Sequence, residues 1–302
     1  MLRSSILALA VAAAVGGAAQ AASPRDQMLV STAWLAEHAA EKDLVILHSG
    51  DAASYGAKHI AGARLAPQDG LSITGADGLT LEMPSAEVLR GQLQALGVSD
   101  NSRIVVYSAG PQIQAATRIM MTLDAAGLGG RASLLDGGLA EWERTGHATT
   151  TEAAVVKAGA LKPLTIKAGK IVDAEFTRTH ASAPGYDVVD ARASAFYDGA
   201  QAGVGGVKGH IPGAKSIPFT SLTTPDGKLK PSEELAAIFK SAGVNPGDHL
   251  VAYCHVGQQA TAVIFAARTL GIDATLYDGS FQEWSKKGLP VEPVAAAATT
   301  PK

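Results

Sequence analysis

Cysteine is the scarcest feature of this chain: Cys254 is the only one in 302 residues, so no disulfide can form within the chain. A lone thiol is either a small buried apolar residue or a free reactive group. Charge is also scarce, because Lys, Arg, Asp and Glu make up only 18% of the residues and the net charge is −3. Without a basic excess, we expect no nucleic-acid partner and no general attraction to membranes.

Long apolar runs are missing beyond the N-terminus, where residues 1–22 have the pattern of a signal peptide. Arg3 supplies a positive charge, residues 6–15 are apolar, and Ala19-Gln20-Ala21 is an A-x-A cleavage pattern. We expect cleavage near Ala21, a periplasmic or secreted mature protein, and no stable membrane span after cleavage. The alternative is an uncleaved anchor, for which the apolar run is short of the roughly 20 residues that span a bilayer.

An internal repeat organises the rest of the sequence. Three pairs of segments match in the same order, about 145 positions apart: 59–63 with 210–214, 107–108 with 253–254, and 136–142 with 278–284. Such ordered matches indicate two homologous domains. We assign them to residues 23–148 and 166–293, with a linker at 149–165 and a flexible tail at 294–302.

Each half alternates short apolar segments with helical ones. In the second half, residues 187–190, 249–253 and 274–277 are typical of strands, and residues 231–243 and 259–270 of helices. Strands that alternate with helices predict an α/β fold, in which a mainly parallel sheet is flanked by helices.

The segment that follows strand 249–253 carries the candidate chemistry. Cys254 stands just past the carboxyl end of this strand, where α/β sheets bind ligands. Backbone N–H groups of the loop and of the first helical turn form a nest for an anion, and the same field stabilises a thiolate. Gly257 permits the tight turn. The alternative is that Cys254 is an inert apolar residue at a strand end.

The loop excludes two other uses of a cysteine. Cysteine phosphatases place an arginine six residues after the nucleophile to clamp the oxyanion, and this chain has Ala260 there. A dithiol redox pair would need a second cysteine. Phosphate chemistry and dithiol exchange are therefore not expected.

Several motifs occur together in one order in the second half. They are residues 190–192 (DAR) with Tyr197, residues 209–214 (GHIPGA), the Cys254 loop, and residues 277–284 (YDGSFQEW). In this combination the chain resembles the tandem-domain rhodaneses, the thiosulfate/3-mercaptopyruvate sulfurtransferase family, in a secreted bacterial form. The resemblance covers roughly residues 28–292 and implies two rhodanese-like domains.

The resemblance also implies that the first domain is degenerate. Ser108 stands at the position of Cys254, and residues 48–50 (HSG) stand where the second half has 190–192. The first domain therefore lacks both nucleophile and arginine. We expect it to act as a packing partner that walls one side of the cleft.

The resemblance implies a sulfurtransferase that works through a Cys254 persulfide. Sulfane sulfur would pass from thiosulfate, or another donor such as 3-mercaptopyruvate, to a thiophilic acceptor such as cyanide or a thiol, without metal or organic cofactor. Arg192, supported by Asp190, would bind the donor. The loop would contribute the remaining contacts, from His255, Val256, Gly257, Gln258 and Gln259.

Arg192 and His255 each have an alternative role. Arg192 is equally consistent with a structural pair to Asp190, and the ring of His255 with simple exposure to solvent. The loop has neither the basic residues typical of thiosulfate-preferring relatives nor the Gly-Ser-Gly typical of mercaptopyruvate-preferring ones; of the two donors, we favour thiosulfate. The alternative functions are a low-turnover persulfide carrier or binding module for a protein partner, and a thiol-based scavenger of oxidants.

Overall fold

The computed structural model describes residues 22–67 and 71–292. Residues 1–21 of the expected signal peptide lie outside the described residues. The expected tail at 294–302 lies outside them as well. None of the helices in the described part is long and apolar enough to cross a membrane.

The first domain is built on five parallel strands in the order β1-β6-β5-β2-β4. Its strands are β1 (Leu29–Val30), β2 (Leu44–Gly50), β4 (Arg64–Pro67), β5 (Arg103–Ser108) and β6 (Ala132–Leu135), and a small antiparallel pair joins β3 (His59–Ile60) to β7 (Thr149–Thr150). Its helices are α1 (Pro24–Met28), α2 (Thr32–His38), α3 (Ala52–Ala57), α4 (Ala86–Ala95), α5 (Gln114–Ala125) and α6 (Gly138–Arg144), with a 3-10 turn η1 (Gly129–Arg131).

The second domain repeats this sheet, again all parallel, in the order β8-β12-β11-β9-β10. Its strands are β8 (Ile171–Val172), β9 (Tyr186–Asp190), β10 (Lys215–Ser216), β11 (His249–Tyr253) and β12 (Ala274–Tyr277). Its helices are α7 (Ala174–His180), α8 (Ser194–Tyr197), α9 (Ser232–Ser241), α10 (Gln259–Thr269) and α11 (Ser280–Lys286), with 3-10 turns η2 (Val204–Gly206) and η3 (Phe219–Leu222). The expected α/β fold with two flanked parallel sheets is confirmed.

The repeated tryptophans help to bury one face of each sheet. Trp142 on α6 and Trp284 on α11 are 6% and 1% exposed, and their indole N–H groups donate to Ala148 O and Pro290 O. Both belong to the apolar clusters beneath their sheets. They are core anchors at matching positions, as expected for segments that must close similar cores.

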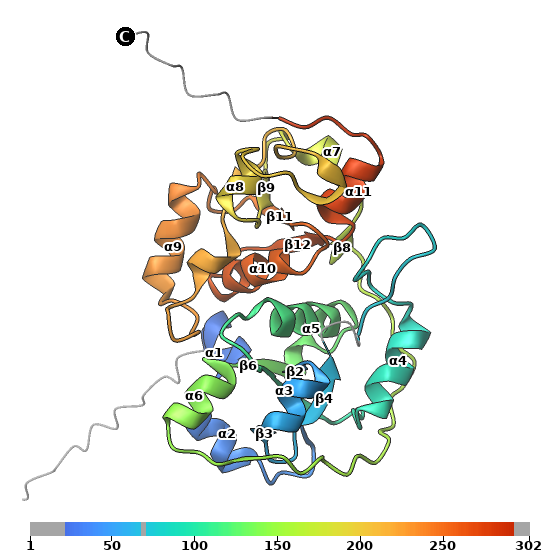
Figure 1. Cartoon of the computed structure of the whole chain (residues 1–302), viewed down its shortest axis with the longest axis vertical. Coiled ribbons are helices and arrows are strands. Elements are labelled where there is room, and N and C mark those ends of the chain that lie inside the picture. Colours follow the sequence, from blue (N-terminus) through green and yellow to red (C-terminus); the bar gives the residue numbers. More distant parts are fainter. Residues whose placement is uncertain (1–21, 68–70, 293–302) are drawn as a thin grey trace, which may run out of the picture.

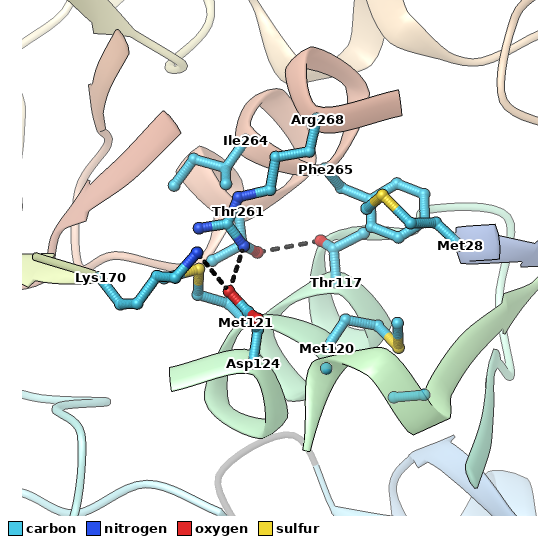
Figure 2. Close-up of a pocket in the computed structure, with 12 residues that line it drawn as sticks. Met28, Thr117, Met120, Met121, Asp124, Lys170, Thr261, Ile264, Phe265 and Arg268 are labelled. Carbon is cyan, nitrogen blue, oxygen red and sulfur yellow. Dashed lines mark hydrogen bonds and ion pairs between the residues drawn. The ribbon is translucent and has the colours of Figure 1, made fainter. Parts of the chain in front are cut away.

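Helices α5 and α10 cover the other faces and meet between the two domains (Figure 1). At their crossing, the hydroxyls of Thr117 and Thr261 lie 2.9 Å apart. These residues hold matching positions in the two halves, so the domains face each other through a near-twofold relation. A cavity of about 150 Å³ remains beside the pair, lined by Met28, Met120, Met121, Ile264 and Phe265 (Figure 2).

Each domain also sends a loop to the other. Backbone N–H groups of Thr80 and Met83 donate to the Gln282 and Asp278 side chains of the second domain, at 2.9 and 2.8 Å. In return, the N–H of Leu229 donates to Asp136 of the first domain at 2.9 Å. Asp136 and Asp278 open the two matching repeats, so the exchange follows the same near-twofold relation and ties the domains into one body.

Candidate active site

Cys254 lies directly after β11, at the carboxyl edge of the second sheet. Its side chain is in the core, and the residue is 1% exposed. Its backbone is tied to the segment that follows β12: Cys254 N–H donates to Ser280 Oγ at 3.1 Å, and Cys254 O accepts from Phe281 N–H at 3.0 Å. Both backbone polar groups of Cys254 are therefore held by the segment that follows β12.

The loop from Cys254 to α10 has the geometry expected of an anion nest. Gly257 has a φ of +76°, which an L side chain rarely adopts, and α10 begins two residues later at Gln259. The N–H groups of His255, Val256 and Gly257 donate to no other group among the described residues. Free N–H groups of this kind, before the N-terminus of an 11-residue helix, favour a negative charge at the loop centre.

Arg192 is fully buried and lies in an ion pair with Asp190. Its Nε and Nη2 donate to both carboxylate oxygens at 2.6–3.0 Å, and Nη2 also donates to Gly209 O at 2.8 Å. Burial would lower the pKa of Arg192, but the hydrogen bonds and charge of Asp190 raise it. The structural pair is therefore present. The buried Nη1, which carries two N–H groups, has no hydrogen-bond partner among the described residues.

Aromatic residues surround this pair. The guanidinium carbon of Arg192 lies 4.0 Å from the centre of the Phe281 ring, a stacking distance. Tyr253 donates its hydroxyl to Asp190 Oδ2 at 2.7 Å and accepts from Ile211 N–H at 3.1 Å. Burial, followed by the charge of Asp190, raises the pKa of Tyr253 well above its ordinary value, so the phenol stays a donor.

His255 is half-buried. Its ring packs edge-on against Phe196 with ring centres 4.5 Å apart, and its Nδ1 is buried without a hydrogen-bond partner. Burial and the nearby charge of Arg192 lower the pKa of His255. The ring is therefore neutral at neutral pH and adds no positive charge to the loop.

The other predicted loop residues lie around the same turn. Gly257 and Gln258 are buried, whereas Val256 and Gln259 are half-buried. The side-chain Oε1 of Gln259 is buried without a partner. The structure thus brings Cys254, the loop and the Arg192–Asp190 pair to one edge of the sheet.

Sequence reasoning missed Ser280 and Tyr253, which hold the Cys254 backbone and the Asp190 carboxylate. Ser280 has a φ of +51°, and its hydroxyl also donates to Tyr277 O at 2.8 Å. A signal for it was present, because the first repeat has Gly138 at this position and glycine is the usual residue at positive φ. A serine at a position that favours glycine indicates that its hydroxyl is needed, here for the hydrogen bonds to Cys254 and Tyr277.

The matching edge of the first domain has a neutral version of the same frame. Tyr107 accepts from Ile60 N–H at 3.1 Å, as Tyr253 does from Ile211, but its hydroxyl meets His48 Nδ1 at 2.8 Å. Burial and the proximity of His59 lower the pKa of His48 to about 4. Ser108 is 4% exposed and its hydroxyl has no partner.

The described residues hold no group of three or more His, Cys, Asp or Glu side chains arranged for a metal ion.

Comparison with known proteins gives a consistent picture. The family model for the rhodanese-like domain matches twice, at residues 31–145 and 173–287. A Pseudomonas aeruginosa protein named a probable 3-mercaptopyruvate sulfurtransferase is 34% identical over 88% of this chain and 97% of its own length. The 3-mercaptopyruvate sulfurtransferase of Escherichia coli K12 is 30% identical over 88% and 98%. The rat thiosulfate sulfurtransferase is 30% identical over 69% and 71%.

Among solved structures, the anaerobic ergothioneine biosynthesis enzyme of Chlorobium limicola superposes with a TM-score of 0.81. It is 20% identical, and the match covers 90% of this chain and 71% of that one. At this identity the likeness supports the shared fold.

Proposed function

The chain belongs to the rhodanese family as a two-domain, rhodanese-type sulfurtransferase, and we propose that Cys254 carries the transferred sulfur as a persulfide. The observation that carries this proposal is the position of Cys254. The only thiol of the chain stands before a loop of unpaired N–H groups, at the edge where α/β sheets bind ligands.

The proposed reaction has two displacement steps. With thiosulfate, the Cys254 thiolate attacks the outer sulfur, the sulfur–sulfur bond breaks, and sulfite leaves with the bonding electrons. The enzyme then holds an anionic persulfide, which the N–H groups of the loop stabilise. A thiophilic acceptor such as cyanide attacks the terminal sulfur in the second step, and thiocyanate leaves as the thiolate is restored. No oxidant, metal or organic cofactor is required.

The donor is recognised by Arg192 and the loop. Nη1 of Arg192 provides the two guanidinium N–H groups that Asp190 and Gly209 leave unused. Because Asp190 balances the charge of Arg192 and His255 is neutral, the site carries little net positive charge. This balance favours a monoanionic donor such as 3-mercaptopyruvate over the thiosulfate dianion, which revises the preference drawn from the sequence. We retain from the sequence the proposal of a periplasmic or secreted mature protein.

Intact-mass spectrometry tests the persulfide directly. The protein is incubated with thiosulfate or with 3-mercaptopyruvate, its mass is measured, and cyanide is then added to assay thiocyanate. We expect the mass to rise by one sulfur atom and to return after cyanide, with a larger turnover for 3-mercaptopyruvate.

Two single-residue variants, one at Cys254 and one at Ser108, complete this experiment. Cys254→Ser should abolish the adduct and the turnover, whereas Ser108→Ala, the matched position in the first domain, should leave turnover within about twofold of the parent. Absence of an adduct with both donors would contradict the proposal. An adduct that cyanide and small thiols do not discharge would instead indicate a persulfide carrier that serves a protein partner.

A further inference from the structure

One buried arginine of the first domain reaches the loop of the second. Arg118 on α5 is 2% exposed. Its Nη1 donates to Gly257 O at 3.1 Å and to Asp278 Oδ1 at 2.5 Å, and its Nη2 donates to Leu81 O. The guanidinium thus joins the Cys254 loop, the repeat that follows β12, and the loop that the first domain sends across.

The contact with Gly257 is close and specific. A Cβ at Gly257 would lie 2.9 Å from Arg118 Nη1 and 2.7 Å from Asp278 O, closer than real Cβ atoms approach. The arginine therefore packs directly against the one residue of the loop with a left-handed backbone. No side chain larger than hydrogen fits between them.

Holding the Gly257 carbonyl has a consequence inside the loop. A peptide unit is planar and trans, so its C=O and the next N–H point in opposite directions. With the carbonyl drawn outward to Arg118, its negative end is kept away from the centre of the loop. A peptide flip in the opposite sense would place a carbonyl oxygen where an anionic sulfur must be stabilised.

The near-twofold relation shows that Arg118 is not among the features that the two domains share. Thr117 and Thr261 meet at matching positions, so the residue of α10 that matches Arg118 is Ala262. The first domain's own loop, residues 109–113, receives no hydrogen bond from a lysine or arginine of the described residues. Of the two matching loops, only the Cys254 loop is therefore contacted by an arginine of the opposite domain.

A second, half-buried arginine at the same interface lacks this connection. Arg268 on α10 donates to Asp124 Oδ2 on α5 at 2.9 Å and to Ala274 O at 2.7 Å. Lys170 joins the same carboxylate at 3.1 Å (Figure 2). Arg268 therefore links the domains by a comparable ion pair, but none of its contacts touches the Cys254 loop. It offers a matched control.

We propose that Arg118 is a positioning residue for sulfur transfer, which acts across the domain boundary by fixing the Gly257 peptide and so the N–H groups that receive the thiolate and the persulfide. This role rests on the proposed function of Cys254. It gives the first domain a part in the reaction although that domain has no nucleophile of its own.

The experiment compares Arg118→Met, Arg118→Lys and Arg268→Met in the full chain. Two readouts are used: kcat and KM for sulfur transfer from 3-mercaptopyruvate to cyanide, and the rate of Cys254 alkylation by iodoacetamide between pH 5 and 9. Thermal unfolding of each variant measures the structural cost. The alkylation readout needs no sulfur donor, so it tests Arg118 even if the persulfide proposal fails.

For Arg118→Met we expect a fall in kcat of about 10- to 100-fold, because misplacement of reacting groups by an ångström has effects of that order. We expect alkylation at pH 7 to slow by about three- to tenfold, because the freed Gly257 carbonyl can turn toward the loop and oppose the negative charge on the sulfur. Arg268→Met should lower the unfolding temperature by a similar amount yet keep both readouts within about twofold of the parent.

Arg118→Lys keeps the positive charge beside Asp278 but lacks the planar fork that holds two oxygens at once. Intermediate values of kcat and alkylation rate are expected, and they provide the test if Arg118→Met does not fold. The proposal is overturned if Arg118 variants unfold more easily but keep the parental kcat and alkylation profile, or if Arg268→Met changes both readouts equally.

Discussion

The two domains share a frame and differ at a few positions that decide what each edge can do. In the first, Tyr107 meets a neutral histidine, His48, whereas in the second Tyr253 meets Asp190, which pairs with Arg192. Both tyrosines accept a backbone N–H from the same repeat. The tyrosine and the repeat are therefore requirements of the fold, and the charged pair is an addition of the second domain.

The same distinction applies along the rest of the edge. Ser108 matches Cys254, Gly138 matches Ser280, and α5 supplies an arginine where α10 has Ala262. Each difference places a polar or reactive group on the second edge only. The comparison teaches that the packing of the sheet demands neither a thiol nor an ion pair at these positions.

The largest effect is expected when the charged pair of the second domain is broken. Arg192→Met leaves the Asp190 carboxylate buried without its counterion, which costs about 3–5 kcal/mol of stability. Sulfur transfer should fall at least about 100-fold, because a donor to the reacting anion is lost. Urea unfolding and the cyanide assay measure the two effects.

The double variant Asp190→Asn with Arg192→Met separates stability from function. By removing both charges it imitates the neutral first domain, and it should recover most of the stability without recovering sulfur transfer. Recovery of both would mean that the arginine serves only to neutralise Asp190.

An intermediate effect on stability is expected when the pH is lowered, because the first domain holds His48 in its neutral form. Unfolded His48 takes up a proton near pH 6.5, but in the folded state its pKa is lowered to about 4. Between these values the unfolded state binds more protons, so this group's contribution to stability falls as pH falls. At pH 5 the loss relative to pH 7 is about 2 kcal/mol.

Urea unfolding of the parent and of His48→Asn at pH 7 and pH 5 measures this contribution. The asparagine variant should be less stable at pH 7 but should lose about 2 kcal/mol less on acidification. Equal pH dependence in both proteins would show that His48 is not kept neutral by the fold.

The smallest effect is expected for Ser280→Gly, which gives the second domain the residue of the first. Glycine relieves the strain of a φ of +51° but removes the hydrogen bonds of the hydroxyl with Cys254 N–H and Tyr277 O. The strain and each hydrogen bond are about 1 kcal/mol, so stability should fall by only about 1 kcal/mol.

Sulfur transfer by Ser280→Gly should still slow several-fold, because the backbone under the thiol loses one of its two anchors. Ser280→Ala provides the control that removes the hydroxyl and keeps the strain. If both variants transfer sulfur at the parental rate, the contact to Cys254 is a packing detail of the second domain.

The fold was predictable from the sequence because its determinants are local. The apolar run of β11 and the helical segment of α10 are continuous in sequence, and the ordered repeat extended this assignment to the first domain. Asp190 and Arg192 are two residues apart, so their pairing was open to prediction.

The rest of the site depends on residues that only tertiary structure brings together. Ser280 lies 26 residues from Cys254, and Arg118 lies 139 residues from Gly257. No periodicity in α5 distinguishes an arginine that faces solvent from one buried against another domain. The neutral state of His255 likewise follows from packing against Phe196, which the loop sequence does not contain.

The contact between Arg118 and Asp278 also imposes an order on biosynthesis. The partners are 160 residues apart, and at about 5–20 residues per second the ribosome needs roughly 8–32 s to make the segment between them. Throughout that interval, Arg118 and the methionine-rich surface of α5 in the nascent first domain lack their partners from the second domain. The contact that holds the Cys254 loop can therefore form only after the ribosome has made Asp278. The first domain, which is synthesised first, completes this contact last.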